Sequence, residues 1–565
     1  DDRDVEAPGT LTVGACNDTI IGTTSDFDIH HVKVDGDLRL SAASGSITDM
    51  GTGSEAAISA FGDVYLTSGT NIKGVGEDTP LRLQVTDDSL LTVTVSGELL
   101  LKQVSEDLMV GDDFDAYVTT GSGSIGNIDD LNAYSLFSGG HMDVEVVEGN
   151  LYLGTLRSND SIDLTADVSV LDYFNDADMP ITNILTDIGT SSTATGDVNI
   201  YAGQDVGTGS NYVDVDIRQG DLNGVSGHDT FINSVRGLNI GDYESEDGNV
   251  TLTIDGKAEV GLITALGDGS PDADGSLSDG VVTIKADTFV EDDNDNPPTS
   301  TNVTNIHSTG AVLIATNAIG SGIGSSDNRF DLRVERLEAS VEAGGIWIRN
   351  EGDAQVGNIA SGFTTDDGEF TALSGISASD TVDIQEFSTL TVNEEIDTDN
   401  GPVLLDAAGG LVINAGILSG GGYVRGWADD DIEFGYNVPN GATGYIDSES
   451  GNAGVTLVAD ENGDGSGGIY MDDGTWIDAV AGVIDLDAND NIVVSLLQTD
   501  TDVLVTSDNG AILDNTGESI HIQDIIANQA ILIAASGIGH NANEMETTFN
   551  YLEAEAGIGG IFIDD

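Results

Sequence analysis

The sequence predicts an all-β protein, and in particular an elongated parallel β-solenoid. Three observations lead to this prediction. One short strand phrase returns from end to end of the 565 residues, two long segments repeat each other, and no window has the apolar spacing of an amphipathic helix. A chain that repeats one short strand and one turn builds an array, in which each strand stacks on its counterpart in the next coil.

The phrase consists of a glycine, in most copies a polar residue, and then apolar–x–apolar. Apolar side chains at alternate positions point to one face of a strand, and the preceding glycine permits the tight turn that begins it. We expect the apolar residues of every copy to face the core, Leu66, Ile314 and Ile561 among them. In chain order the expected strands lie within residues 36–40, 62–66, 149–153, 196–200, 248–252, 310–314 and 560–563.

A longer repeat joins three such strands. Residues 310–350 and 529–563 share a strand, a Gly-Ile-Gly turn, a variable polar loop, a second strand, Leu-Glu-Ala, and a third strand after Gly-Gly. Ala530 follows Ala311 by 219 residues, whereas Ile561 follows Ile346 by 215, and residues 62–103 fit the same frame. Loop insertions change such spacings without breaking a coil, which favours the solenoid over the alternative, a tandem of β-sandwich domains.

We divide the chain into an N-terminal β-repeat region, residues 1–298, and a C-terminal β-repeat region, residues 299–565. The sequence stops inside a copy of the strand phrase, at Ile561–Asp565. We therefore expect further coils of the same chain, or a neighbouring subunit, to continue the stack beyond residue 563. An open end of a solenoid exposes unpaired strand groups, and these pair readily with another strand.

The chain is strongly acidic. It contains 100 Asp and Glu against 16 Lys and Arg, for a net charge of −84, and it has no lysine after Lys285. Such a surface repels nucleic acid and anionic lipid, so neither is an expected partner. No apolar run is long enough for a transmembrane helix, so the chain is not membrane-inserted. The single cysteine, Cys16, excludes an intrachain disulfide.

The carboxylates repel one another unless they are neutralised. Two explanations remain open: adaptation of the surface to high salt, which screens charge, and specific binding of Ca²⁺ by clustered carboxylates. Three segments bring together carboxylate or amide oxygens that could bind calcium, although the first of them, at Asp460, is equally typical of a solvated acidic turn. These candidate metal ligands are Asp460, Asn462 and Asp464; Asp292, Asn294 and Asp295; and Asp485, Asp487 and Asn489.

The Gly-Ile-Gly, Leu-Glu-Ala and Gly-Gly-Ile-x-Ile phrases resemble the repeats of very large bacterial surface proteins of the filamentous-haemagglutinin and β-strand-repeat adhesin type. This resemblance implies a secreted, cell-surface body used for adhesion or coating. Residues 292–298 also match the D-x-N-D-N-x-P linker of cadherin repeats. The acidic partner that a cadherin repeat needs is absent at the right distance, because Asp272 and Asp274 lie too close to Asp292. The match therefore indicates a calcium-binding turn only.

These observations predict an extracellular structural protein, a segment of a cell-surface adhesin, fibre or S-layer-like coat. We expect it to be stabilised by calcium and to self-associate into a filament or sheet. The alternative is a calcium-dependent module that binds glycans or another cell surface. A polysaccharide-degrading β-helix enzyme is a third reading, but carboxylates are so abundant that no pair of them indicates acid–base catalysis. We predict no catalytic residues and no enzymatic activity.

Overall fold

The computed structural model describes most of the chain. The described residues are 10–51, 56–75, 81–85, 90–95, 98–103, 115–120, 122–126, 131–138, 142–146, 150–158, 160–172, 182–186, 196–265, 267, 280–292, 304–316, 321–359, 364–365, 368–369, 373–435, 443–448, 453–515 and 523–564. Strands are their only regular secondary structure, and none of them is helical. The prediction of an all-β protein is confirmed.

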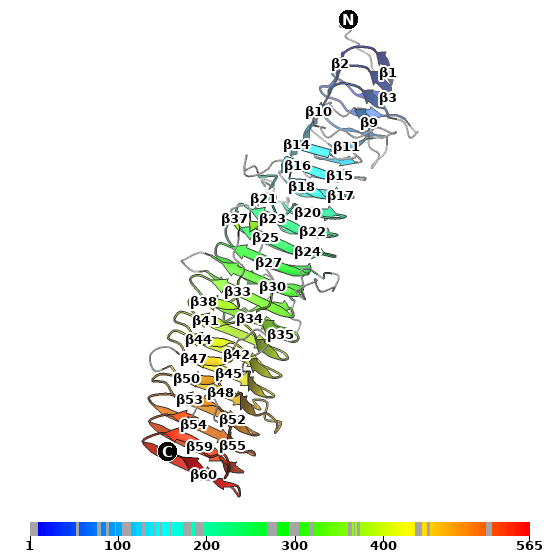
Figure 1. The fold of residues 1–565 in the computed structure, drawn as a ribbon. Helices are drawn as coiled ribbons and strands as arrows, with labels where there is room; N and C mark the ends of the chain where they lie inside the picture. Colours follow the sequence, from blue (N-terminus) through cyan, green and yellow to red (C-terminus); the bar gives the residue numbers. More distant parts are fainter. Residues whose placement is uncertain are drawn as a thin grey trace. The chain divides into compact units, whose positions relative to one another are not determined.

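The chain forms two compact units, and each is described by itself. Unit 1 comprises Asp1–Asp255 and Phe363–Phe370, and unit 2 comprises Gly256–Gly362 and Thr371–Asp565. The predicted division between residues 298 and 299 lies outside the described residues. In both units long ladders of parallel strands make up the fold (Figure 1). This solenoid-like architecture fits the predicted parallel stacking and does not fit tandem antiparallel sandwiches.

Unit 1 contains two parallel ladders, and the chain alternates between them. A small antiparallel hairpin, β36 (Thr364–Thr365) and β37 (Gly368–Glu369), also belongs to this unit. The first ladder consists of β1 (Thr10–Ala15), β3 (Phe27–Val34), β5 (Ile47–Asp49), β6 (Ile58–Ala60), β8 (Ile72–Gly74), β9 (Leu81–Val85), β11 (Glu98–Gln103), β13 (Ser122–Gly126), β15 (Met142–Val146), β17 (Ile162–Ala166), β20 (Val198–Ala202), β22 (Leu222–Ser226) and β24 (Leu238–Ser245). The second consists of β2 (Thr19–Thr23), β4 (Leu38–Ala42), β7 (Val64–Ser68), β10 (Leu90–Val95), β12 (Asp115–Thr120), β14 (Leu131–Ser138), β16 (Leu151–Ser158), β18 (Val170–Asp172), β19 (Ile184–Thr186), β21 (Val213–Ile217), β23 (Thr230–Ser234) and β25 (Val250–Ile254).

Unit 2 begins with longer strands. Farther along the chain it consists of three parallel ladders, and every coil contributes one strand to each ladder. The first strands are β26 (Ala258–Ala265), β27 (Val281–Ala286), β28 (Phe289–Asp292), β29 (Ile306–Ser308), β30 (Gly310–Ala315), β31 (Gly322–Ile323), β32 (Phe330–Arg333) and β33 (Arg336–Val341). The first ladder is β34 (Ile346–Asn350), β39 (Val382–Glu386), β42 (Val403–Ala407), β45 (Val424–Ala428), β48 (Val455–Ala459), β51 (Ile484–Ala488), β54 (Asp502–Ser507), β57 (Gln529–Ala534) and β60 (Tyr551–Ala556).

The other two ladders complete each coil of unit 2. The second ladder is β35 (Ala354–Val356), β40 (Leu390–Val392), β43 (Leu411–Ile413), β46 (Ile432–Phe434), β49 (Ile469–Met471), β52 (Ile492–Val494), β55 (Ile512–Asp514), β58 (Gly537–Ile538) and β61 (Gly560–Ile561). The third ladder is β38 (Ile376–Ala378), β41 (Ile396–Thr398), β44 (Gly416–Ser419), β47 (Tyr445–Asp447), β50 (Trp476–Asp478), β53 (Leu496–Gln498), β56 (Ile525–Ile526), β59 (Met545–Thr548) and β62 (Ile563–Asp564).

Apolar residues of successive coils stack in register and form the core. Leu38 lies opposite Val64 and Leu40 opposite Leu66, so two copies of the strand phrase pack directly on each other. All four side chains are at most 1% exposed. Burying one such side chain contributes about 1.5–3 kcal/mol, and the in-register stack repeats this contribution at every coil.

The repeat found in the sequence is longer than one coil. Ala311 on β30 pairs with Leu337 on β33, and Ala530 on β57 pairs with Leu552 on β60. The first strand and the Leu-Glu-Ala strand of the repeat are therefore neighbours in one ladder. The third strand of the repeat, β34 or β61, likewise stacks on β31 or β58, so the repeat consists of one complete coil and the first two strands of the next.

In residues 310–350 and 529–563, the second glycine of the Gly-Ile-Gly phrase that follows the first strand makes a left-handed turn. Gly324 has φ +62° and Gly539 has φ +63°. A Cβ atom at Gly539 would lie 2.1 Å from the carbonyl oxygen of Phe562 in the next coil. Only glycine satisfies both the backbone conformation and this close approach.

Ile561 lies in register with the fully buried Ile538 but is itself 45% exposed. Its strand, β61, pairs with β58 on one side and with no other strand of the described chain. Neighbouring coils bury the equivalent residues from both sides, and this strand has a neighbour on one side only. Ile561 therefore keeps the inward position that the phrase predicts, and its exposure reflects the single neighbouring strand.

Ile314 does not take the expected inward position. It lies opposite Lys285 and Ser340, whereas its neighbour Leu313 lies opposite the buried Ile284 and Ala339.

The difference in exposure between Ile561 and the buried inward residues generates a matched test of the core. Leu313→Asp in unit 2 and Leu66→Asp in unit 1 place a carboxylate among buried inward side chains, since the two residues are 0% and 1% exposed. We expect each to lower the local unfolding free energy by at least about 3 kcal/mol, because the charge has no partner there. Ile561→Asp should change it by less than about 1 kcal/mol. Amide hydrogen exchange of β30, β7 and β61 measures each effect locally. Equal protection losses at all three positions would contradict the inward stacking.

Candidate functional site

The first predicted calcium segment forms one exposed turn. Asp460 follows β48 and adopts a left-handed conformation with φ +71°. Its carboxylate accepts a hydrogen bond from the backbone N–H of Gly465 at 3.1 Å, and Asn462 Oδ1 accepts one from Asp464 N at 2.9 Å. The turn therefore brings the three predicted ligands together. The same oxygens also stabilise the turn by accepting these hydrogen bonds. Calcium binding by this turn, as opposed to a simple solvated acidic turn, therefore stays a prediction.

The third predicted segment divides between two places. Asp485 and Asp487 lie on the outward face of β51, where strand neighbours offer no further carboxylate: Thr456 and Leu504 flank Asp485, and Val458 and Thr506 flank Asp487. Burial raises the pKa of Asp485, and burial followed by Asp508 and Asp485 raises that of Asp487.

Asn489 lies in the turn after β51, and its side chain forms hydrogen bonds with residues of neighbouring coils. Its Nδ2 donates to the carbonyl oxygen of Gly465, and its Oδ1 accepts from Nδ2 of Asn509. Asn489 therefore connects the acidic turn at residues 460–467 to the next coils, and both ends of its amide have partners. The structure thus joins the first and third predicted segments through a structural hydrogen bond.

The second predicted segment is described only at its first residue. Asp292 ends β28, and its backbone lies opposite Val260 of β26. Asn294 and Asp295 lie outside the described residues. The calcium-binding turn predicted from the cadherin-like motif stays a prediction.

Sequence reasoning missed a cluster of three carboxylates in unit 2. Asp514, Asp524 and Glu546 each place one oxygen within 4.8 Å of the other two. Asp514 ends β55, Asp524 directly precedes β56, and Glu546 lies on β59, so three separate strands position them. Asp524 is fully buried, Asp514 is buried and Glu546 is half-buried.

The two carboxylate oxygens of Asp524 differ in their hydrogen bonding. Its Oδ2 accepts from the backbone N–H of Glu546 at 2.9 Å. Its Oδ1 is also buried and accepts no hydrogen bond from the described residues. Burial, followed by the neighbouring Asp514 carboxylate, raises the pKa of Asp524 to about 9. The sequence has no lysine or arginine after Arg425, so adjoining coils provide no cationic side chain of either type.

One sequence signal could have found part of this cluster. Ile512-Leu513-Asp514 is a strand with inward and outward positions alternating, and Asp514 occupies an inward position where the pattern expects an apolar residue. The other two members carry no such signal, because they come together only through the stacking of coils.

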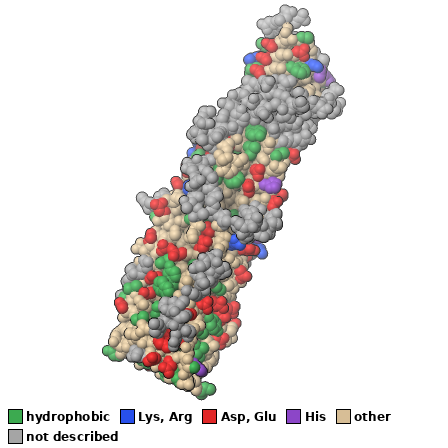
Figure 2. Space-filling view, viewed as in Figure 1, with side chains coloured by type: hydrophobic (Ala, Val, Ile, Leu, Met, Phe, Trp, Pro, Cys, Tyr) green, Lys and Arg blue, Asp and Glu red, His purple; other side chains and the backbone are tan. Residues whose placement is uncertain are grey.

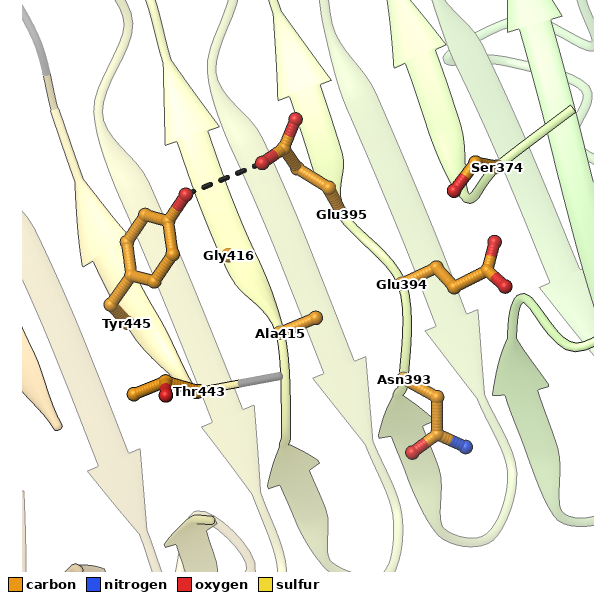
Figure 3. Close-up of a pocket in the computed structure, with 8 residues that line it drawn as sticks. All are labelled: Ser374, Asn393, Glu394, Glu395, Ala415, Gly416, Thr443 and Tyr445. Carbon is orange, nitrogen blue, oxygen red and sulfur yellow. Dashed lines mark hydrogen bonds between the residues drawn. The ribbon is translucent and has the colours of Figure 1, made fainter. Parts of the chain in front are cut away.

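An open pocket of about 500 Å³ lies on the same unit (Figure 3). Tyr445 and Glu395 point toward each other there, and the Tyr445 hydroxyl donates to Glu395 Oε2 at 3.3 Å. One face of the Tyr445 ring stacks on Trp476 with 4.5 Å between centroids, and Gly416 lies so close that a Cβ atom would come within 2.5 Å of the ring. Tyr445 therefore offers the pocket its edge and hydroxyl only. Burial and the nearby acids, Glu395 first, raise its pKa to about 12.

The surface carries mostly one sign of charge. Figure 2 shows many red carboxylate side chains and few blue basic ones on the visible face. Two ion pairs join described residues at 2.7 Å, Arg82 with Asp49 and Arg329 with Asp383. No helix long and apolar enough to cross a membrane occurs in the part of the chain that the structure describes.

Comparison of the chain with protein-family models, with curated proteins and with solved structures finds no match. The fold and the geometry above are therefore the basis for any functional conclusion.

Glu386 provides a test of buried charge that is independent of the cluster. It is 1% exposed at the end of β39, and Asn350 Nδ2 donates to its Oε2 at 3.0 Å. Burial raises its pKa from 4.5 to about 8, against the opposing effect of the Asn350 hydrogen bond. Because the folded pKa is raised, the stability linked to this group is complete below about pH 4.5 and is lost as pH rises through about 8.

We predict that Glu386→Gln removes this loss. Between the two pKa values the wild-type unfolding free energy should fall by up to about 1.4 kcal/mol per pH unit relative to the variant. Hydrogen exchange of β39 at a series of pH values measures the difference. Glu351→Gln, at an exposed carboxylate, is the control and should keep the wild-type slope. Parallel pH profiles for Glu386→Gln and wild type would show that Glu386 ionises without cost.

Proposed function

We propose that this protein is an extracellular structural protein, a segment of a cell-surface adhesin, fibre or S-layer-like coat, and that each unit is a parallel β-solenoid. The observation that carries the proposal is the set of parallel ladders in each unit, to which successive coils add their strands. A fold that grows by adding coils provides length and surface, which are the properties of a structural body.

The interior supports a non-catalytic role. Inward positions of the ladders are occupied by Val, Ile, Leu and Ala side chains that are almost fully buried. The core is therefore packed, and the outer face is what such a body presents to its surroundings. The high negative charge keeps separate bodies apart in solution and favours contacts that are bridged by cations or formed end to end.

The proposed location rests on composition and on the resemblance of the repeat phrases to filamentous-haemagglutinin-type surface proteins. Within this chain the phrase has one structural role in two coils, because Gly324 and Gly539 both make left-handed turns at the same point of their coils.

Self-association is proposed at the edge of β60. This strand pairs with β57 on one side and has no partner strand on its other side within the described residues. Tyr551 and Leu552 on it are 67% and 42% exposed. An unpaired edge with apolar side chains is a template for a further strand, supplied by more of the same chain or by another copy.

The test of the proposed function is the state of assembly. We expect filaments or sheets in electron micrographs, and light scattering that increases with protein concentration. Leu552→Lys with Tyr551→Lys places two charges on the edge strand and should reduce assembly, whereas Val235→Lys, at an exposed apolar residue of unit 1, should not. A monodisperse protein that retains a carbohydrate on a glycan array would instead support a binding module.

We also propose that Ca²⁺ stabilises the acidic turn at residues 460–467. Melting in chelator, in calcium and in sodium chloride of matched ionic strength separates binding from screening, because a ligand of the native state stabilises it as its concentration exceeds the dissociation constant. We expect calcium to raise the midpoint more than salt does, and Asp460→Asn with Asp464→Asn to lose part of that difference. Equal protection by salt would remove this site.

A further inference from the structure

Three buried polar residues occupy the same kind of corner in different coils. Asn183, Asn305 and Asp524 are each fully buried and each directly precede a short strand, β19, β29 or β56. The carbonyl oxygen of each accepts a hydrogen bond from a backbone N–H of the preceding coil, at nearly the same distance. These donors are Leu156 at 2.6 Å, Ile263 at 2.7 Å and Leu497 at 2.7 Å.

At two corners an asparagine side chain satisfies the neighbouring backbone in both directions. Its Oδ1 accepts from the next coil: Asp214 N donates to Asn183 at 2.7 Å and Asp331 N donates to Asn305 at 2.8 Å. Its Nδ2 donates to the preceding coil, to Leu153 O at 3.1 Å and to Val260 O at 2.8 Å. The donor and acceptor ends of the amide both have partners, as a buried amide requires.

Asp524 reproduces only half of this arrangement. Its Oδ2 accepts from Glu546 N at 2.9 Å, as the asparagine Oδ1 does at the other corners. Its second oxygen occupies the position that the side-chain amide nitrogen has in Asn183 and Asn305. A carboxylate oxygen cannot donate a hydrogen bond. This atom is the buried Oδ1 that accepts no hydrogen bond from the described residues.

The corner also places a second acid at an equivalent position. Asp172 lies opposite Leu153, and its Oδ1 accepts from Nδ2 of Asn183 at 2.6 Å. Asp514 lies opposite Val494, which precedes Leu497 by the same three residues by which Leu153 precedes Leu156. Asp514 therefore meets a carboxylate where Asp172 meets an amide N–H.

We propose that Asp514, Asp524 and Glu546 bind a divalent cation, Ca²⁺, in the position that the side-chain amide holds at the other two corners. Calcium–oxygen distances of about 2.4 Å place opposite ligands about 4.8 Å apart. The three carboxylate oxygens lie within 4.8 Å of one another, so one ion can contact all of them. Ca²⁺ also accepts irregular oxygen sites, whereas Mg²⁺ demands near-ideal octahedral geometry and keeps several waters.

The decisive variant is Asp524→Asn, which restores the amide found at residues 183 and 305. We expect wild type to bind one more Ca²⁺ per chain than the variant by isothermal titration calorimetry. We expect calcium to increase hydrogen-exchange protection of β55, β56 and β59 at least tenfold in wild type only. In chelator the variant should be the better protected of the two at these strands.

Two further variants and one control variant keep the test decisive. Glu546→Gln removes one proposed ligand and leaves its backbone N–H in place, so it should weaken the same calcium effect even if Asp524→Asn fails to fold. Asn183→Asp introduces a third carboxylate beside Asp172 and Asp214, and should make protection of β19 depend on calcium. Asp464→Asn, in the exposed turn, should leave the effect at β56 unchanged.

The site is overturned if calcium leaves the protection of β55, β56 and β59 unchanged in wild type, or if Asp524→Asn and Glu546→Gln respond to calcium as wild type does. The cluster would then hold a proton shared between carboxyl groups. This readout is local to one corner of unit 2, so it is independent of whether the protein assembles or of whether the turn at residues 460–467 binds calcium.

Discussion

The rest of the structure depends on the parallel, in-register stacking of coils. A single coil contains two or three strands, often only three to five residues long, and cannot bury its own apolar face. Both its backbone hydrogen bonds and its apolar contacts come from the coils on either side. Stacking therefore places like residues on like, as for Leu38 on Val64 and Leu40 on Leu66.

This constraint limits which residues can occupy the corners of the coils. Where the chain turns from one strand to the next, the regular ladder of hydrogen bonds is interrupted, and backbone groups that face inward need side-chain partners. Small polar residues occupy such positions in unit 2, and Ser448, Thr475 and Ser495 are all fully buried. Asparagine meets the requirement in both directions. An aspartate meets half of it, and for this reason we propose a cation at that corner.

The same stacking also determines how close the outward carboxylates of successive coils lie to one another. Neighbouring strands lie about 4.8 Å apart, so carboxylates at the same register position of successive coils, such as Asp447 and Asp478, lie close together. We propose that ions of the surroundings or bound cations reduce this repulsion. Proposed roles as a coat or fibre fit units whose surfaces carry many more acidic than basic side chains.

The sequence alone determined the strand phrase, the all-β class and the local turns, because these depend on residues that are neighbours in the chain. Asp460, Asn462 and Asp464 come together for that reason. Tertiary structure decided which residues meet across coils. The register advances by 21 residues from Val382 to Val403 but by 31 from Val424 to Val455, so coil length follows no fixed period. Asp514, Asp524 and Glu546 could not be grouped from their spacing, since only the stacked backbone sets which side chains of different coils share a corner.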